Sequence, residues 1–425
     1  MMKKTVVPLL SVAALLGSAS AAFSGDLPSR EEMWKILQQQ QQEINALKQE
    51  LGSQKREPPP APTPPTAQGS QAAPAPQAAA ANGEQKKELP WSERINLSGV
   101  VDVRANTMKN YAKVHSSDVV IDTVKLAADV KVSDLVKGRM VLLHEEPLNT
   151  STTTMPDPAF VDIDEATITL GDTDKHPLYL TAGRKTVPFG RFTTTLISDP
   201  LTQQLGETKE SVAEVGFKSN GAYGSVYAFN GNANKKGKDT IDQFGADLGY
   251  GGKVREVTFD FGASMTNSLE DSEVVTARVA AVPGANITNM QQHVSGAALH
   301  ASAGFGGVTL LGEFITAMDR FDLTELPWNG RGAKPRSWNL EAAYGFQILG
   351  KETTTSIAWQ GSDEALALGL PENRFMLGAS MGVYEKTTLA FEWMHDKDYG
   401  TSDTGTAAGT NRTANTGTAK LAVEF

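Results

Sequence analysis

The chain has 425 residues, no cysteine and a formal net charge of −10. The lack of cysteine excludes a disulfide framework, a zinc knuckle and a thiol nucleophile, and the acidic balance argues against nucleic-acid binding, which needs clustered Lys and Arg. No run of 18 apolar residues follows Ala22 and the mean hydropathy is −0.28, so the sequence predicts no transmembrane helix.

Residues 1–21 have the pattern of a secretory signal peptide. Lys3 and Lys4 precede an apolar run that ends in Ala19-Ser20-Ala21, the small-x-small pattern that signal peptidase cleaves. We expect the mature chain to begin near Ala22 and to be exported. The alternative, an uncleaved membrane anchor, would need a longer apolar run than this one.

Residues 22–57 are expected to form a periplasmic coiled-coil helix. Within residues 30–52 the apolar positions alternate at spacings of four and three, with Gln40 at the remaining core position: Met33, Leu37, Ile44, Leu47 and Leu51. About three heptads are marginal for a lone helix in water, so self-association is predicted. The alternative is an amphipathic helix that lies on its own protein. Residues 58–93, rich in Pro and Ala over residues 58–85, are predicted to be an extended linker.

From residue 94 to residue 425 the sequence alternates with a period of two. Ile95, Leu97 and Val101 take one face of the first segment, while Asn96 and Ser98 take the other, as in a half-buried strand. The same pattern recurs about sixteen times, starting near residues 94, 118, 139, 161, 178, 212, 222, 242, 254, 293, 307, 337, 352, 373, 386 and 416.

The connections between these segments alternate between short and long. Tight joins such as 219–221 and 251–252 alternate with long ones such as 186–211 and 266–292. Outer-membrane barrels have this arrangement, with short periplasmic turns and longer outside loops. The chain also ends in GTAKLAVEF, an alternating segment with a terminal aromatic residue. The predicted fold class is an all-β transmembrane barrel of about 16 antiparallel strands, preceded by the short α-helical coiled coil.

The search for catalytic and metal-binding motifs gives little. The six His residues have no close metal-binding spacing, GNANKKGK at 231–238 departs from a phosphate loop, and GxSxG is absent. The sequence therefore predicts no enzyme, no metal site and no cofactor.

The chemistry that remains is passage through a lumen. Sixteen strands enclose more space than wall side chains fill, and no folded plug precedes the first strand, so we expect diffusive transport.

The third long loop, 186–211, is expected to fold inward, because it carries apolar residues that a surface loop would expose. The alternative is a solvated surface loop stabilised by local ion pairs. The predicted pore-constriction residues are Arg184, Arg191, Asp199, Glu207, Lys209 and Glu210, and the predicted lumen-wall residues are Arg104, Lys125, Asp129 and Lys131. Acidic loop residues that oppose basic wall residues would create a transverse field.

Residues 182–217, AGRKTVPFGRFTTTLISDPLTQQLGETKESVAEVGF, together with the preceding VDIDEATITLGD, resemble the LbtU-type siderophore porin family of Gram-negative outer membranes. The signal peptide, coiled coil, linker and barrel fit the same family. The resemblance implies uptake of ferric siderophore across the outer membrane, which would make the chain an iron transport protein.

Other functions remain open from the sequence. One is a general, sugar- or anion-selective porin, and another is an outer-membrane tether that acts through the periplasmic coiled coil. The expected location is the outer membrane of a Gram-negative bacterium, with the N-terminal helix in the periplasm. The expected partners are outer-membrane lipid and lipopolysaccharide, a small solute and further copies of the chain in a homotrimer, with no nucleic acid.

Overall fold

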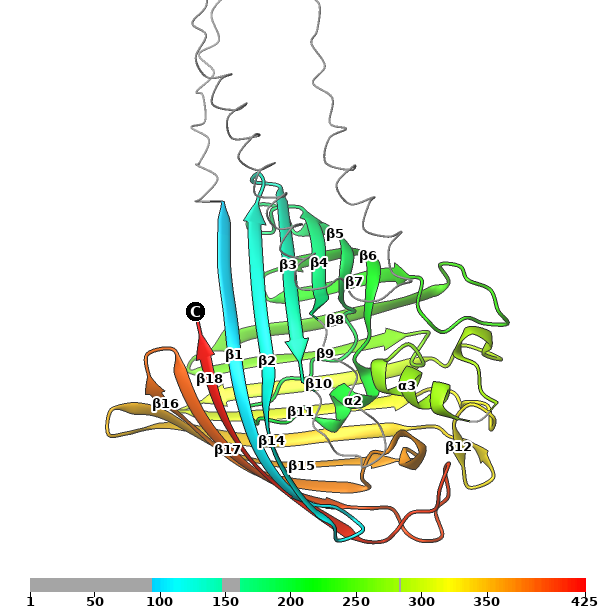
Figure 1. Ribbon diagram of the computed structural model, residues 1–425. Helices are drawn as coiled ribbons and strands as arrows, with labels where there is room; N and C mark the ends of the chain where they lie inside the picture. Colours follow the sequence, from blue (N-terminus) through cyan, green and yellow to red (C-terminus); the bar gives the residue numbers. More distant parts are fainter. Residues whose placement is uncertain (1–93, 147–160, 283) are drawn as a thin grey trace, which may run out of the picture. The chain divides into compact units, whose positions relative to one another are not determined.

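The computed structural model describes residues 94–146, 161–282 and 284–425. These residues form a closed antiparallel barrel of sixteen strands (Figure 1). The barrel strands are β1 (Ile95–Lys109), β2 (His115–Lys131), β3 (Val136–Glu145), β4 (Asp162–Leu170), β5 (Leu178–Thr186), β6 (Lys209–Ser219), β7 (Ala222–Phe229), β8 (Gln243–Val254), β9 (Val257–Thr266), β10 (Gly296–Phe305), β11 (Val308–Ala317), β14 (Arg336–Ile348), β15 (Lys351–Asp363), β16 (Asn373–Tyr384), β17 (Thr387–Lys397) and β18 (Thr413–Glu424). The sixteen-strand prediction is confirmed.

Each strand of the barrel pairs with its neighbours in sequence, and β1 pairs with β18 to close the ring. At the closure the backbone N–H groups of Gly99 and Phe425 each donate to the other's carbonyl oxygen, both at 3.0 Å. Glycine fits here because a Cβ at position 99 would lie 2.8 Å from the Lys125 carbonyl oxygen, as well as 2.4 Å from the Phe425 ring. Because every strand is paired on both sides, the barrel has no free edge. A sheet that spans a bilayer must be closed in this way, since its backbone N–H and C=O groups find no water there.

The two faces of the wall differ as the period-two pattern predicts. In β17, Phe391 and Trp393 are 54% and 41% exposed on the outer face, whereas Glu392 between them is 5% exposed and points inward. In β1 the outward row includes Leu97 and Val103, while Arg104 is on the inner face. Because side chains alternate strictly along a strand, the pairing register fixes which residues face the lumen.

Long loops gather at one end of the barrel and short turns at the other, as predicted. The β6–β7 turn consists of Asn220 and Gly221, with φ of 50° and 87°, a turn that matches strand twist. At the opposite end the long loops contain α2 (Leu201–Gly206), α3 (Glu273–Ala281), η2 (Ile287–Asn289), η3 (Leu366–Leu368) and a small hairpin of β12 (Pro327–Trp328) with β13 (Arg331–Gly332).

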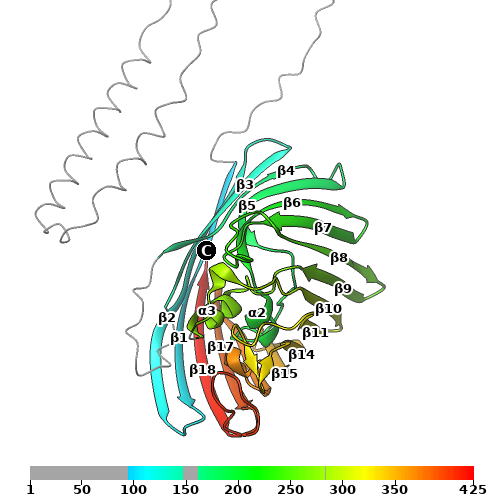
Figure 2. The same ribbon diagram turned by 90° about the vertical axis from the view of Figure 1, so that its right-hand side faces the viewer.

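The long loops share a hydrophobic core. Its fully buried members include Phe189 and Leu205 from one loop, Leu269 from a second and Leu326 from a third. Figure 2 faces this end and shows α2 and α3 within the ring of strands. Packing among the loops therefore covers one side of the barrel mouth.

The predicted signal peptide 1–21, coiled-coil helix 22–57 and linker 58–93 lie outside the described residues. Within the described residues, no helix is both long and apolar enough to span a bilayer.

Candidate functional site: the loop inside the barrel

The loop between β5 and β6 lies inside the barrel. We call residues 187–208 the inner loop; its base is closed by the Val187 N–H, which donates to the Thr208 carbonyl oxygen at 2.9 Å. The side chains of Phe189, Leu201 and Leu205 are at most 1% exposed. The predicted range 186–211 is slightly too long, because Lys209 and Glu210 begin β6.

Glu313 of β11 binds both ends of the inner loop. Its carboxylate accepts the Arg191 backbone N–H at 2.6 Å and the Phe192 N–H at 3.3 Å, and it accepts the Thr202 hydroxyl at 2.6 Å. Phe192 has a φ of 56°, and Gly190 before it a φ of 79°. This left-handed bend directs the two successive N–H groups toward the carboxylate.

Glu341 of β14 binds the middle of the inner loop. It accepts the Thr195 N–H at 2.7 Å and hydroxyl at 2.5 Å, and the Thr194 hydroxyl at 2.7 Å. The Thr195 hydroxyl also lies 2.6 Å from the Ser356 hydroxyl of β15. Bonds between an ionised acceptor and these donors are of the stronger kind.

Glu392 of β17 also binds the middle of the inner loop, three residues further along. It accepts the N–H groups of Ile197 and Ser198 at 2.7 and 3.1 Å, and the Ser198 hydroxyl at 2.6 Å. Gln360 of β15 then accepts the Leu201 N–H at 3.0 Å, where α2 begins.

Three inward carboxylates therefore fasten the inner loop to the wall, at intervals of about three residues along the loop. We call Glu313, Glu341 and Glu392 the carboxylate row. Each carboxylate is less than 10% exposed. Buried carboxylates are costly without partners, and here backbone N–H and hydroxyl groups supply them. The inner loop consequently lies along the β11–β17 side, and the remaining lumen lies between this loop and the β1–β6 wall.

The β1–β6 wall carries a network of ion pairs. Arg104 of β1 lies 2.6 Å from Asp122 of β2, and Lys125 and Lys209 both contact Asp164, at 3.4 and 2.9 Å. Further along, Arg139 of β3 contacts Asp129 at 2.8 Å and Glu165 at 2.9 Å. The predicted wall residues Arg104, Lys125, Asp129 and Lys131 share the inner face. Their charges pair mainly within the wall, a mixed arrangement that the sequence did not indicate.

Three predicted constriction residues lie near this wall. Glu207, at the end of α2, accepts from Gln203 Nε2 at 2.8 Å, and its carboxylate lies 3.9 Å from the Lys209 ammonium. Asp199 is exposed to the lumen. The surrounding protein and the neighbouring Glu207 raise the pKa of Asp199, while Arg104 across the lumen lowers it again. The charges of Asp199 and Arg104 are therefore close enough to interact.

The other predicted constriction residues lie elsewhere. Arg191 contacts Asp260 of β9 at 3.6 Å and lies 4.8 Å from the ring centroid of Tyr223 of β7. Glu210 is buried and accepts from Asn232 of the next long loop at 2.9 Å.

Arg184 lies on β5, beside the residue that pairs with Glu210. It alternates with Lys185 along β5 and so lies on the outer face, where its Nε donates to the Ile163 carbonyl oxygen at 3.1 Å. The inward basic residue at this level is Lys185, which contacts Glu214 at 2.6 Å. The alternation along β5 thus places Lys185, and not Arg184, on the inner face at this level.

At the short-turn end, the inner faces of β1–β5 line a cavity of about 530 Å³. Basic residues on it include Lys137, Arg139 and Lys185, and hydroxyl groups come from Thr167 and Thr181. The carboxylates of Asp129 and Glu165, which pair with Arg139, also line this cavity, so it combines charges of both signs with hydroxyl groups.

The sequence reasoning missed the carboxylate row. Each of its members is a single Glu at an inward position, in LLGEFIT, NLEAAY and AFEWMH. A lone Glu between outward apolar residues is the signal that could have found it. The described residues contain no group of three His, Cys, Asp or Glu side chains arranged to hold a metal ion.

Contact between Leu196 and Gly378 of β16 predicts a specific crosslink. A Cβ at Gly378 would lie 2.4 Å from Leu196 Cδ2, so the two positions touch. Because the chain has no cysteine, Leu196→Cys combined with Gly378→Cys is expected to form one disulfide under mild oxidation, measured as a gel shift that a reductant reverses. The control pair, Leu196→Cys with Gly312→Cys on the outer face, is expected to stay unlinked. Equal crosslinking of both pairs would contradict the position of the inner loop.

Asp271 predicts a pH-dependent stability of the loop core. Its carboxylate accepts the Ala233 N–H at 2.7 Å and the Ser268 hydroxyl at 2.5 Å, and burial raises its pKa to about 6. Because this pKa lies above that of the unfolded chain, the stabilising contribution is full below about pH 4 and is lost as the pH rises through about 6. Hydrogen exchange at 231–233 and 268–271 is expected to be slower at pH 5 than at pH 7.5, after correction for intrinsic rates. In Asp271→Asn the difference should largely disappear; full retention would assign it to other groups, such as His293 beside Glu270.

Comparison with known proteins identifies relatives in Gram-negative bacteria, and no family model matches the sequence. A UPF0422 protein of Coxiella burnetii is 26% identical over 332 residues, covering 76% of this chain and 68% of the relative. A UPF0422 protein of Legionella pneumophila is 26% identical over 361 residues, covering 79% and 67%.

Among solved structures, the chain resembles an anion-selective porin from Comamonas acidovorans, with a TM-score of 0.54 and 14% identity over 78% of this chain and 99% of the porin. It also resembles Pseudomonas putida OprB, with a TM-score of 0.52 and 11% identity over 79% and 95%. At these identities the likeness shows the fold, which is that of the outer-membrane porins.

Proposed function

We propose that the protein is an outer-membrane porin through which small solutes diffuse. The observation that carries this proposal is the inner loop, fastened along one side of the barrel by the carboxylate row so that the lumen is narrowed on the β1–β6 side. In this proposal the pore constriction is formed by Asp199, Glu207 and Lys209 with Arg104, Lys125 and Lys185 opposite. No catalytic role is proposed.

The outer face supports a location in the outer membrane. Aromatic pairs lie near both ends of the barrel: Trp338 with Trp359 and Phe375 with Trp393 toward the long loops, and Tyr250 with Phe261 and Tyr344 with Phe346 toward the short turns. Two aromatic girdles with an apolar band between them are typical of membrane barrels. In this orientation the short turns face the periplasm.

The solute class that we propose first is a ferric siderophore. Its support is the resemblance of residues 182–217 to the LbtU-type siderophore porins. The cations and hydroxyl groups of the turn-end cavity also suit anionic, hydroxyl-rich solutes, so an anion- or sugar-selective porin is the second candidate.

Two measurements on the full chain test these proposals together. In planar bilayers the purified protein is expected to form stable open channels whose conductance falls when a permeating ferric siderophore is added. Growth on ferric siderophore as the iron source should depend on the gene and be restored by it. Channels without siderophore-dependent growth would retain the porin and reject the solute, whereas absence of conductance would reject the porin itself.

We further propose that the porin is a homotrimer, supported by the heptad pattern predicted in residues 30–52. Deletion of residues 30–52 is expected to weaken the trimer, measured by chemical crosslinking in outer membranes. An unchanged trimer would show that the barrels associate by other surfaces.

A further inference from the structure

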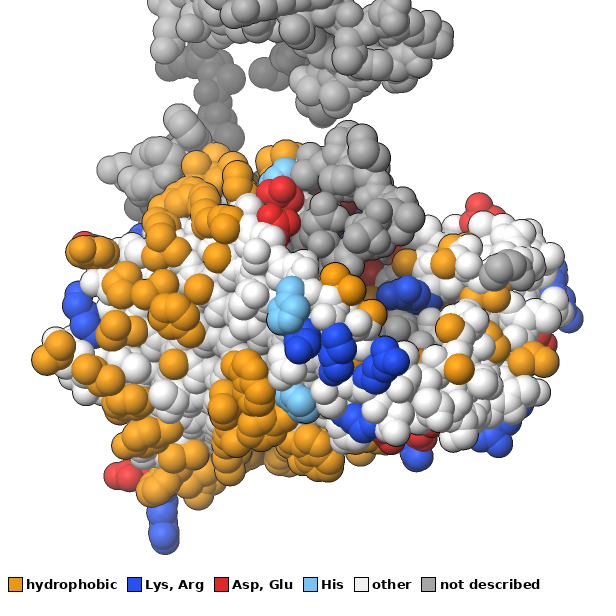
Figure 3. All heavy atoms as spheres, turned by 60° about the horizontal axis from the view of Figure 1, so that its bottom comes forward, with side chains coloured by type: hydrophobic (Ala, Val, Ile, Leu, Met, Phe, Trp, Pro, Cys, Tyr) orange, Lys and Arg blue, Asp and Glu red, His pale blue; other side chains and the backbone are white. Residues whose placement is uncertain are grey.

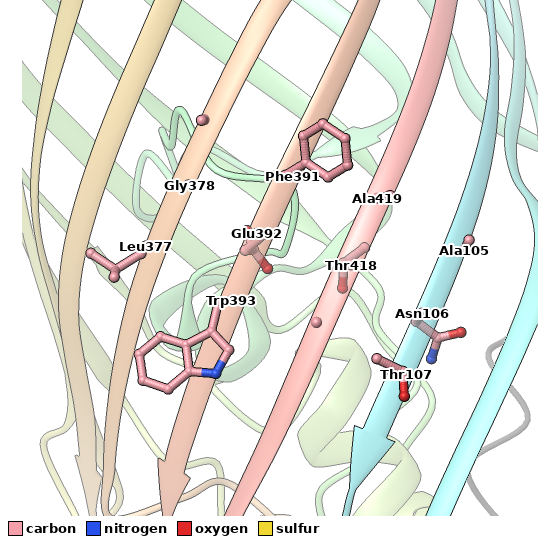
Figure 4. Close-up of a pocket in the computed structure, with 12 residues that line it drawn as sticks. Ala105, Asn106, Thr107, Leu377, Gly378, Phe391, Glu392, Trp393, Thr418 and Ala419 are labelled. Carbon is pink, nitrogen blue, oxygen red and sulfur yellow. The ribbon is translucent and has the colours of Figure 1, made fainter.

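The outer wall of β1, β16, β17 and β18 carries an apolar groove of about 640 Å³. Figure 4 shows Phe391 and Trp393 of β17 beside Leu377 of β16, with Ala105 and Thr107 on the opposite side. Phe391, Trp393 and Leu377 are 54%, 41% and 44% exposed. Part of the groove is thus bounded by large apolar side chains that no described residue covers.

The strand register explains the depth of this groove. Ala105 pairs with Ala419, which pairs with Phe391; one row nearer the long loops, Thr107 pairs with Gly417, which pairs with Trp393. The groove floor on β1 and β18 therefore consists of small residues, and the aromatic residues of β17 stand beside it. A Cβ at Gly417 would meet only Thr107 Cγ2, at 3.5 Å, so there is open space above the floor.

Cations occupy the long-loop end of the same strands. Lys109 follows Ala105 and Thr107 on the outward face of β1, while Lys397 ends β17 and Lys113 and Arg412 lie in the adjoining loops. Lys113 Nζ donates to the Thr413 carbonyl oxygen at 2.8 Å, and Lys397 Nζ donates to the Asn411 carbonyl oxygen at 2.9 Å. Figure 3, in which the lower end of the molecule comes forward, shows Lys, Arg and His side chains gathered beside the apolar wall.

These cations are not neutralised by the described part of the protein. None of the ion pairs among the described residues involves Lys109, Lys113, Lys397 or Arg412. The nearby carboxylates of β17 and its loop have other partners: Asp396 pairs with Arg374 on the inner face, and Asp398 accepts from the Thr410 hydroxyl and N–H. The outer rim therefore presents unmatched positive charge directly above an apolar groove.

We infer that this face binds one phosphorylated, acylated lipid of the outer leaflet, a site that rests on the membrane orientation proposed above. The phosphates lie against Lys109, Lys113, Lys397 and Arg412, and an acyl chain lies over Ala105, Thr107, Gly417 and Ala419 beside Phe391 and Trp393. Trp393 marks the level where headgroup meets hydrocarbon, because Trp is enriched at that depth. Charge complementarity favours a phosphorylated lipid over a second copy of the chain, since the rim offers cations without facing carboxylates.

The test is native mass spectrometry of the delipidated full chain, with bisphosphorylated lipid A as the probe. The wild-type protein is expected to retain one lipid A molecule with preference over dephosphorylated lipid A and phosphatidylethanolamine. A triple variant carries Lys109→Gln, Lys113→Gln and Lys397→Gln. It should bind lipid A about a hundredfold more weakly, because each cation near an anionic lipid surface contributes about fivefold to the affinity. Gly417→Leu should displace the acyl chain while leaving the cations in place.

The matched control replaces Lys218, Lys253 and Lys386, exposed at the short-turn end, with glutamine and should bind lipid A as the wild type does. Every variant is checked for heat-modifiable migration and single-channel conductance, both expected to be unchanged; lost conductance would bear on the porin proposal and not on lipid binding. Unchanged lipid A binding by the triple variant, or equal binding of dephosphorylated lipid A, would overturn the site. Dissociation of the oligomer by Gly417→Leu with lipid A binding intact would assign the groove to a second copy.

Discussion

Replacing Glu341 and Glu392 together with alanine is expected to release the middle of the inner loop from the barrel wall. The double variant loses the acceptor for three backbone N–H groups, those of Thr195, Ile197 and Ser198. A hydrogen bond to a charged acceptor contributes about 1.5–3 kcal/mol, although lumen water will replace part of it. We therefore expect single-channel conductance to rise and open-channel noise to increase severalfold in planar bilayers.

Two controls separate loop fastening from loss of charge. The double variant Glu341→Gln with Glu392→Gln keeps a carbonyl acceptor at each position. Its single-channel conductance and open-channel noise are expected to be close to those of the wild type. Glu165→Ala removes an inward carboxylate that contacts Arg139 and not the inner loop, and should leave the noise unchanged. Equal noise in the Glu165 variant and the double alanine variant would show that lumen charge, not loop attachment, controls it.

Reversing the charge of Asp199 and Glu207 to lysine is expected to shift ion selectivity strongly toward anions. A unit charge about 8 Å from a permeating ion in water changes the energy of that ion by about 0.5 kcal/mol. A reversal changes the energies of the anion and the cation by about 1 kcal/mol each, in opposite directions, so before screening by salt each reversal changes the anion-to-cation permeability ratio by about thirtyfold. The measurement is the reversal potential across a KCl gradient centred near 0.1 M, where screening is incomplete.

Glu256→Lys, at the exposed β8–β9 turn, makes the matched change in net charge away from the lumen and should have little effect. Asp199→Asn is expected to give about half the shift of Asp199→Lys. An unchanged reversal potential in the Asp199 and Glu207 variants would reject these residues as part of the constriction.

The barrel could be predicted because apolar and polar residues alternate along each of its strands, a pattern that is visible in short stretches of sequence. Alternation along segments such as Ile95–Val103 reports which face meets apolar surroundings, and this holds for every strand. The same rule places Lys185 on the inner face of β5 and Arg184 on the outer face.

The loop core and the carboxylate row could not be predicted in the same way. The bond from Arg191 to Glu313 joins residues 122 positions apart, and the bond from Ile197 to Glu392 joins residues 195 apart. No local period encodes such pairs; they depend on how far around the ring the inner loop reaches. Helix α3 was missed for a related reason, because EVVTARVAA buries only Val275 and Val279 and shows little amphipathic pattern.

Because of the carboxylate row, the path of the inner loop and the side chains that the loop presents to the lumen depend on different residues. The carboxylate row accepts hydrogen bonds from main-chain N–H groups, which every residue except proline supplies, as well as from Thr and Ser hydroxyl groups. The path of the inner loop is therefore specified in part by strands far away in the sequence. Side chains such as Asp199 can then change without moving that path. Substitutions in the inner loop could thus alter the selectivity of the proposed pore. The barrel residues that determine its width would stay the same.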